Sequence, residues 1–97
     1  MLYRFFYPAS GWDVSNVTDM SDMFYQLYYF NQDLSGWDVG NVDDMTMMFN
    51  NAWAFDQNLG WCVQSDAIVD KWFNSTPFDK TPCFKARCGV HVKGVDC

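Results

Sequence analysis

Residues 12–20 read Trp-Asp-Val-Ser-Asn-Val-Thr-Asp-Met, and residues 37–45 read Trp-Asp-Val-Gly-Asn-Val-Asp-Asp-Met, 25 positions later. The similarity continues, because the Met-Phe pair of 23–24 and the Phe-x-Gln-x-Leu segment of 30–34 also return after 25 positions. A period of this length is typical of repeat proteins, whose units are too small to own a core and bury their apolar faces against one another.

One unit has a simple physical interpretation. Residues 30–34 place apolar side chains at both ends of an alternating segment, which predicts a short strand with Phe30 and Leu34 facing inward. Further on, the apolar positions have the i, i+3, i+4, i+7 spacing of a one-sided helix. That predicted helix contains Met45, Met48, Phe49 and Ala52. Stacked units would form a parallel sheet on one side and short helices on the other.

A third, degenerate copy begins at Trp61, and Trp72-Phe73 is predicted to take the place of the Met-Phe pair. The chain then divides into a partial repeat, two full repeats, a degenerate repeat and a terminal cap that contains cysteines. The corresponding ranges are 1–11, 12–60, 61–79 and 80–97.

The composition excludes several classes of protein. Hydrophobic residues make up 49% and aromatic residues 20% of the chain, which favours a folded domain over a disordered tail. The net charge is −6 and only six residues are basic, which argues against nucleic-acid binding, since phosphate contacts need clustered Lys and Arg. No apolar run approaches the roughly 18 residues of a membrane-spanning helix.

The string Phe-Asn-Gln-Asp-Leu-Ser-x-Trp-Asp-Val-x-Asn-Val-x-x-Met-x-x-Met-Phe at 30–49 is distinctive. It resembles the BspA-type leucine-rich-repeat surface proteins, a family that includes mycoplasma-type lipoprotein repeats of unknown function. The segment from 59 to 90, with its cysteines, looks like the terminal segment of the algal and protist variants. The resemblance implies a right-handed, leucine-rich-repeat-like α/β solenoid, usually extracellular, that serves in adhesion or protein recognition.

All four cysteines lie from the third repeat onward. An even number confined to a small, loop-rich region predicts disulfides and an oxidising compartment, either outside the cell or in an organelle lumen. Of the three possible pairings, Cys62–Cys83 with Cys88–Cys97 is the favoured one, because it ties the degenerate repeat to its tail. Free thiols and a zinc site that uses Cys83-x4-Cys88 remain alternatives.

No catalytic constellation emerges, and the sequence predicts neither an enzyme nor a cofactor. His91 has no serine or acid at motif spacing, and we expect it to be solvated. The repeat stacks Asp13 over Asp38 and Asp19 over Asp44, about one strand spacing apart. Such ladders of oxygen atoms are a possible calcium site, whereas the simpler interpretation is that each aspartate closes its own turn.

Aromatic residues outside the core positions predict a protein-binding surface, since Tyr and Trp anchor interfaces. Tyr28, Tyr29 and Trp53 precede the repeated phenylalanines and should form one ridge. The open N-terminal face is a second candidate docking surface. Its large apolar residues include Phe5, Phe6 and Tyr7. The chain is therefore expected to be a non-enzymatic protein-binding module, either in a surface adhesin or as a small subunit of a larger assembly. A carbohydrate- or calcium-binding surface module is the alternative.

Overall fold

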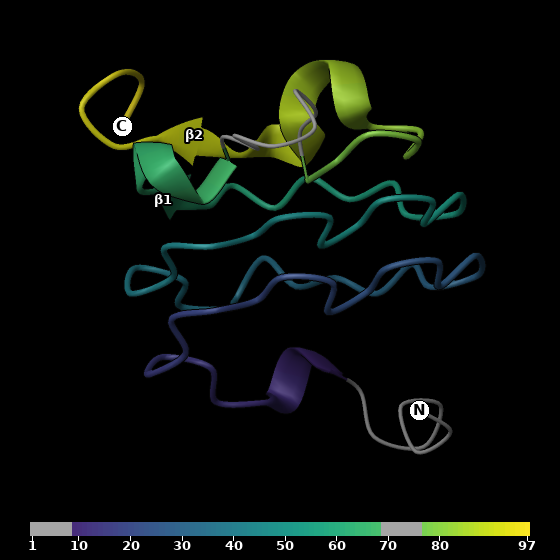
Figure 1. The fold of residues 1–97 in the computed structure, drawn as a ribbon, viewed down its shortest axis with the longest axis horizontal. Helices are drawn as coiled ribbons and strands as arrows, with labels where there is room; N and C mark the ends of the chain where they lie inside the picture. Colours follow the sequence, from purple (N-terminus) through teal and green to yellow (C-terminus); the bar gives the residue numbers. More distant parts are fainter. Residues whose placement is uncertain (1–8, 69–76) are drawn as a thin grey trace.

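The structure, a computed structural model, describes residues 9–68 and 77–97. In those ranges most of the chain forms turns and extended stretches that lie across the molecule in rows (Figure 1). The regular elements are short and concentrate near the C-terminus. They are the 3₁₀ helices η2 (Ala9–Gly11), η3 (Ser65–Ile68) and η4 (Phe84–Gly89), and the strands β1 (Cys62–Val63) and β2 (His91–Val92).

The rows form three layers, defined here as residues 9–33, residues 34–58, and residues 59–68 with 77–87. Backbone hydrogen bonds join each layer to the next. In the first layer every second amide from Met20 to Gln26 donates to a carbonyl of the second layer, at 2.8–2.9 Å. These pairs are Met20 to Asp44, Asp22 to Thr46, Phe24 to Met48 and Gln26 to Asn50. The sequence separation is the same in all of these pairs, so the register between the layers follows directly from the repeat.

The segment expected to be a helix at 45–52 is instead a run of turns, and the same holds for the matching segment of the first layer. The helix prediction was wrong because two positions in each layer have left-handed backbone. Their φ values are 60° at Asp22, 58° at Gln26, 59° at Met47 and 61° at Asn51. The amides of Asp22 and Gln26 themselves donate to the second layer, whereas the amide after each of them closes a turn, so amides alternate between the next layer and turn closure.

The predicted strand at 30–34 is not formed either, although Phe30 and Leu34 are buried as expected. Regular parallel pairing occurs instead between β1 and β2, with Cys62 opposite His91 and Val63 opposite Val92. These two strands belong to the third layer and to the tail that follows it, which lie together at the yellow-green end of the molecule (Figure 1).

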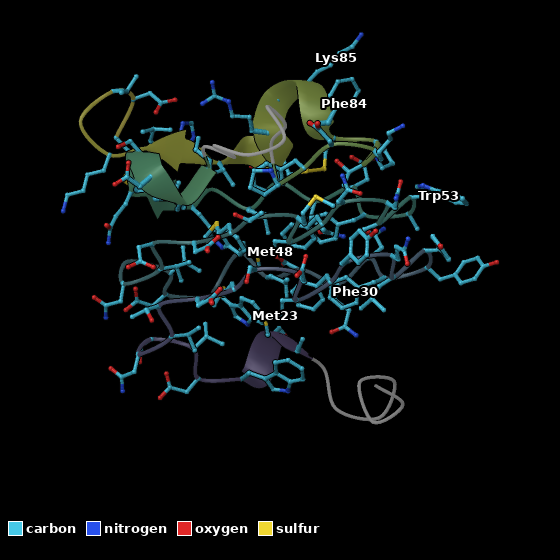
Figure 2. All side chains as sticks on the ribbon, in the orientation of Figure 1. Met23, Phe30, Met48, Trp53, Phe84 and Lys85 are labelled. Atoms are coloured by element: carbon cyan, nitrogen blue, oxygen red, sulfur yellow. A yellow bond between two sulfur atoms is a disulfide. The ribbon has the colours of Figure 1, made fainter. Side chains whose placement is uncertain are left out.

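The core consists of aromatic columns in which the same repeat position stacks on itself. Phe24, Phe49 and Phe78 stack with ring centroids 5.2 and 5.7 Å apart. Trp72 and Phe73, predicted for the third place in this column, lie outside the described residues, and Phe78 occupies the place against Phe49. The Phe49 amide donates to the carbonyl of Pro77, just as the Phe24 amide donates to the second layer. Figure 2 shows Phe30 and Met48 inside the stack.

A second column contains the tryptophans that begin each repeat. Trp12, Trp37 and Trp61 stack with both centroid distances at 6.2 Å. The indole N–H of Trp37 donates to the Ala9 carbonyl at 2.8 Å, and that of Trp61 donates to the Leu34 carbonyl at 2.9 Å. Both bonds are buried, so each tryptophan supplies apolar area and also satisfies a carbonyl one layer back.

The tail closes the stack with two disulfides, Cys62–Cys97 and Cys83–Cys88. The prediction of disulfides is confirmed, but the favoured pairing was wrong. Since β2 runs beside β1, the end of the tail returns to Cys62, and η4 brings Cys88 back to Cys83 with their Cα atoms 4.8 Å apart. Paired cysteines indicate an oxidising environment.

The two disulfides differ in what they contribute. By loop-closure entropy, the bond that spans 35 residues stabilises by about 4 kcal/mol, and the one that spans five by about 2 kcal/mol. Within the smaller ring, Arg87 and Cys88 are both left-handed, with φ of 50° each. Such a conformation costs on the order of 1–3 kcal/mol per non-glycine residue. The smaller ring therefore gives little or no net stability.

Five aspartates of the repeats close their own turns. Asp13 accepts hydrogen bonds from the Ser15 amide and hydroxyl at 3.1 and 2.7 Å, and Asp19 accepts the same pair from Ser21 at 2.9 and 2.6 Å. Three further aspartates accept from an amide two residues on. They are Asp33, Asp38 and Asp44. The simpler interpretation of these residues, as turn-closing side chains, thus accounts for their positions.

The indole hydrogen bond of Trp37 should add to the stability of the fold beyond what the ring contacts contribute. Trp37→Phe removes the indole donor and leaves the buried Ala9 carbonyl with the Trp12 amide alone, which costs about 0.5–1.5 kcal/mol and lowers Tm by roughly 2–12 °C. Trp12→Phe is the matched control, because the half-buried Trp12 indole has no acceptor among the described residues. Thermal unfolding of both variants checks the expectation, and equal losses would contradict it.

Stability should fall in acid because of the turn-closing carboxylates. Hydrogen bonds from Ser15 and Ser21 hold the pKa values of Asp13 and Asp19 below their usual 3.8, and the Ser35 amide and hydroxyl do the same for Asp33. A lowered folded-state pKa stabilises the protein above the ordinary value, and this stabilisation is lost as pH falls through the folded-state value.

We therefore expect Tm to drop between about pH 5 and about pH 2. A triple variant with Asn at positions 13, 19 and 33 should show a smaller drop, since an amide keeps an acceptor oxygen but does not titrate. A control variant with Asn at positions 43, 56 and 66 loses the same charge and should keep the wild-type drop. Parallel pH profiles for all three proteins would contradict this origin.

Candidate functional site

The exposed aromatic side chains gather where two layers present the same repeat position. Tyr28 and Trp53 are equivalent residues of successive repeats, and their ring centroids lie 4.6 Å apart. The amide of Ala54 donates to the Tyr28 carbonyl at 3.1 Å, which fixes this register. Tyr29 is 91% exposed, Trp53 61% and Tyr28 40%. We call these three residues the aromatic ridge.

The ridge is anchored at its base by the buried residues that follow it in the sequence. Phe30 and Phe55 stack on each other with ring centroids 5.9 Å apart. Phe30 directly follows Tyr29 in the sequence, and Phe55 comes two residues after Trp53. The Trp53 indole N–H donates to the Asn51 side-chain oxygen at 3.3 Å, and Asn51 itself lies in one of the left-handed turns. The ridge thus presents large rings whose backbone is held by the stack, as an interface anchor requires.

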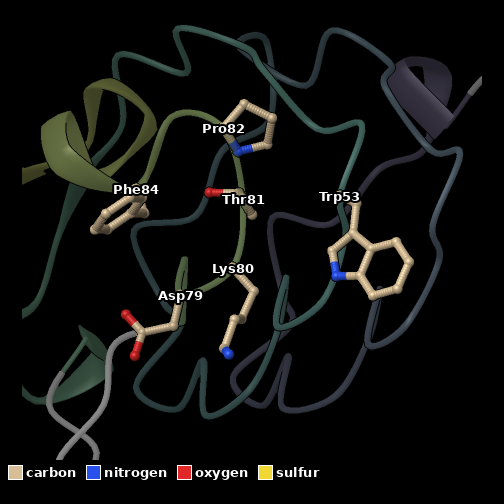
Figure 3. Close-up of a pocket in the computed structure, with 6 residues that line it drawn as sticks. All are labelled: Trp53, Asp79, Lys80, Thr81, Pro82 and Phe84. Carbon is tan, nitrogen blue, oxygen red and sulfur yellow. The ribbon is translucent and has the colours of Figure 1, made fainter.

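A groove of about 600 Å³ continues from Trp53 toward the cap. Its other lining residues come from the third layer, and Figure 3 shows them along one stretch of chain across from the tryptophan. They are Asp79, Lys80, Thr81, Pro82 and Phe84. Phe84 is 47% exposed, and the Thr81 hydroxyl donates to the Phe78 carbonyl at 2.6 Å. The groove therefore combines apolar walls with one acidic and one basic side chain. Trp53 and Phe84 project outward from different layers (Figure 2).

The ridge residues were predicted from the sequence, whereas the groove was not. Pro82 and Phe84 follow Phe78 at the same distances at which Trp53 and Phe55 follow Phe49, so they are the third-layer equivalents of those residues. A fixed repeat period does not reveal this equivalence, because the segment from Trp61 to Phe78 is longer than that from Trp37 to Phe49. The N-terminal candidates lie outside the described residues. They are Phe5, Phe6 and Tyr7.

The residues proposed as metal ligands have other partners in the described ranges. No group of three or more His, Cys, Asp or Glu residues there has an arrangement that could hold a metal ion. The carboxylates proposed for a calcium ladder bond instead to their own turns, as at Asp13 and Asp19. All four cysteines are in disulfides, so they do not form the alternative zinc site.

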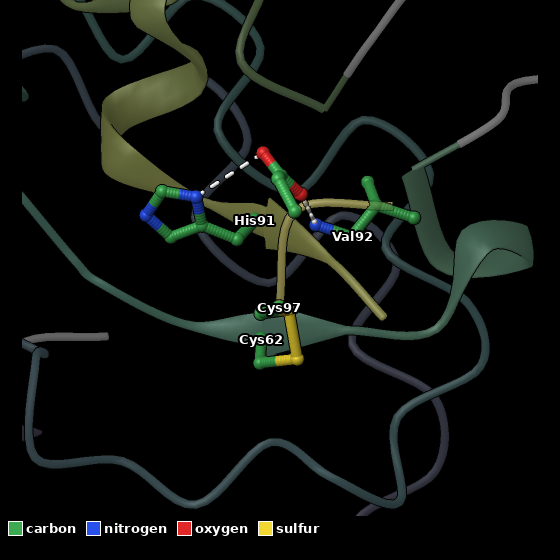
Figure 4. Close-up of polar contacts among 5 residues, drawn as sticks. Cys62, His91, Val92 and Cys97 are labelled. Atoms are coloured by element: carbon green, nitrogen blue, oxygen red, sulfur yellow. Dashed lines mark hydrogen bonds and ion pairs between the residues drawn. A yellow bond between two sulfur atoms is a disulfide. The ribbon is translucent and has the colours of Figure 1, made fainter. Parts of the chain in front are cut away.

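His91 lies in the tail, near the disulfide of Cys62 and Cys97 (Figure 4). Its Nδ1 is 3.2 Å from a carboxylate oxygen of Asp96, and the other oxygen of that carboxylate accepts the Val92 amide at 2.6 Å. Both side chains are 49% exposed. Hydrogen bonds from the Val92 amide and from His91 lower the pKa of Asp96. The pair closes the final turn and is half exposed to solvent.

In the described part of the chain, no helix has the length and apolar character needed to cross a membrane.

Three comparisons with known proteins bear on the family. A search of curated proteins and a search of solved structures returned no match. One family model matches residues 2–83, which is most of the chain. The chain therefore belongs to the family described as Mycoplasma protein of unknown function, DUF285.

Proposed function

We propose that this chain is a non-enzymatic repeat module, a solenoid of the BspA-like type, that binds a protein partner through the aromatic ridge and the adjoining groove. The observation that supports this most directly is the exposure of the Tyr28–Trp53 pair. Burying large exposed rings stabilises an interface strongly, and the rings here belong to layers that are already ordered. A partner would thus meet a preformed surface and lose little affinity to ordering.

The setting of the module is part of the same proposal. Two disulfides suit a secreted protein or the lumen of an organelle, and the repeat sequence resembles that of BspA-type surface proteins. Residues 9–68 contain no Lys or Arg, so the first two layers have a negative field. We infer an extracellular or surface role in recognition, either within an adhesin or as a small subunit of an assembly.

A carbohydrate ligand is the second candidate, favoured by the lining of the groove. The largely exposed indole of Trp53 lines the groove together with the polar side chains of Asp79 and Lys80, and an aromatic platform with hydrogen-bonding groups suits a sugar ring. An array of immobilised glycans probed with the wild-type chain and with Trp53→Ser separates the two candidates. Binding to a defined glycan that depends on Trp53 would replace the protein proposal with this one.

Removing two ridge rings should weaken partner binding without unfolding the protein. Tyr29→Ser with Trp53→Ser is expected to lower affinity at least about tenfold, since interface aromatics commonly contribute about 2 kcal/mol or more. Tm should stay close to that of the wild type, because both rings are mainly exposed. The partner is first captured from the native source on immobilised wild-type protein and identified by mass, and affinities are then measured with the purified partner.

Val95→Ser is the matched control for this test. Val95 is an apolar side chain that is 81% exposed and lies in the tail, away from the ridge. It should leave affinity unchanged. Equal affinity of the double variant and the wild type would refute the ridge as the binding surface, and so would an equal loss in Val95→Ser.

A further inference from the structure

The disulfide between Cys83 and Cys88 lies between two hollows of the surface. On one side, Cys83 separates Pro82 from Phe84, the two residues that form the apolar wall of the groove opposite Trp53. On the other side is a second hollow of about 420 Å³, lined by both cysteines together with Asp56, Gln57, Asn58, Ala86 and Gly89. Cys88 is buried, whereas Cys83 is half-buried, so a small thiol in the second hollow has access to the sulfur of Cys83.

The backbone inside the ring is held in an unusual conformation. Arg87 and Cys88 are consecutive left-handed residues, each with φ of 50°, and Gly89 follows with φ of 77°. A side chain at position 89 would collide with the side-chain oxygen of Asn58. Two adjacent non-glycine residues adopt this region only where surrounding bonds impose it. Here the bonds are the disulfide and the Cys88 amide, which donates to the Cys83 carbonyl at 2.9 Å.

Charge also distinguishes this disulfide from the other one. The ring contains Lys85 and Arg87, in a chain whose residues 9–68 have no basic side chain. The attacking species in disulfide exchange is an anionic thiolate, and the leaving group is also a thiolate, so nearby cations favour both. A carboxylate lies near each disulfide, since Asp56 lines the second hollow and Asp96 directly precedes Cys97, so the distinguishing charges are the two cations of the smaller ring.

We propose that Cys83–Cys88 is a thiol–disulfide exchange site for a small dithiol reductant. One thiolate of the dithiol attacks the sulfur of Cys83, the S–S bond breaks, and Cys88 leaves as a thiolate that takes up a proton. The second thiol of the reductant then attacks the mixed disulfide and releases Cys83 as a thiol. The protein gains two electrons and two protons, and the dithiol is oxidised to its cyclic disulfide.

Exchange at this site should loosen the wall of the groove. The Cys88 carbonyl accepts the Leu59 amide at 2.8 Å, and the Phe84 amide donates to the Thr81 carbonyl at 3.4 Å. Once the ring opens, Arg87 and Cys88 are free to leave the left-handed region, and both bonds weaken with them. The exchange itself is independent of the proposed function, whereas its control of partner binding rests on that function.

The order of reduction tests the exchange site. The folded protein is equilibrated with graded ratios of reduced to oxidised dithiothreitol, free thiols are alkylated, and the modified cysteines are located by mass spectrometry. We expect Cys83–Cys88 to open at a ratio at least about tenfold lower than Cys62–Cys97. Exposure alone predicts the reverse order, because Cys62 and Cys97 are both exposed. Simultaneous opening, or earlier opening of Cys62–Cys97, would overturn the proposal.

Two paired variants test the link to the groove. In Cys83→Ser with Cys88→Ser, hydrogen exchange at the Leu59 amide should quicken at least about tenfold, while the Phe24 amide between the first two layers stays protected. Cys62→Ser with Cys97→Ser should leave the Leu59 amide protected. Unchanged protection of Leu59 in the first variant would overturn the coupling. If the partner then binds both variants equally, redox control of binding is refuted while the exchange site and the proposed function stand.

Discussion

The structure depends on one constraint, which is the register of the backbone hydrogen bonds between layers. Every second amide in the turn runs donates to a carbonyl of the next layer, as Phe24 does to Met48. The register places identical repeat positions above one another, so aromatic rings stack in columns and the tryptophan indoles reach carbonyls one layer back. Because the helices and strands of the described ranges are short, this cross-layer bonding satisfies polar groups that secondary structure would otherwise satisfy.

The same register explains where the candidate site lies. A side chain that points outward in one layer has its counterpart beside it in the next, so Tyr28 and Trp53 form a pair by position alone. In the third layer the counterpart of Trp53 is Pro82, and the smaller ring leaves the groove between Trp53 and Phe84. The surface offered to a partner is therefore the edge of the aromatic stack, exposed where the repeat becomes irregular.

The sequence predicted burial better than it predicted secondary structure. Met45, Met48, Phe49 and Ala52 are all buried, as their spacing indicated, but spacing by three and four residues fits a run of four-residue turns as well as it fits a helix. Only left-handed backbone distinguishes the two, and the left-handed positions hold Asp, Gln, Met and Asn, without the glycines that would have given a signal. The disulfide pairing was unpredictable for a different reason, because it depends on the tail folding back beside β1.

Scalar couplings across hydrogen bonds, measured by NMR on protein labelled with ¹⁵N and ¹³C, test the layer register most directly. The account predicts coupling of the Phe24 amide to the Met48 carbonyl and of the Phe49 amide to the Pro77 carbonyl. A helical arrangement would couple each of these amides to the carbonyl four residues earlier, at Met20 and Met45. Coupling to those two carbonyls would contradict the stacked layers and the candidate site that depends on them.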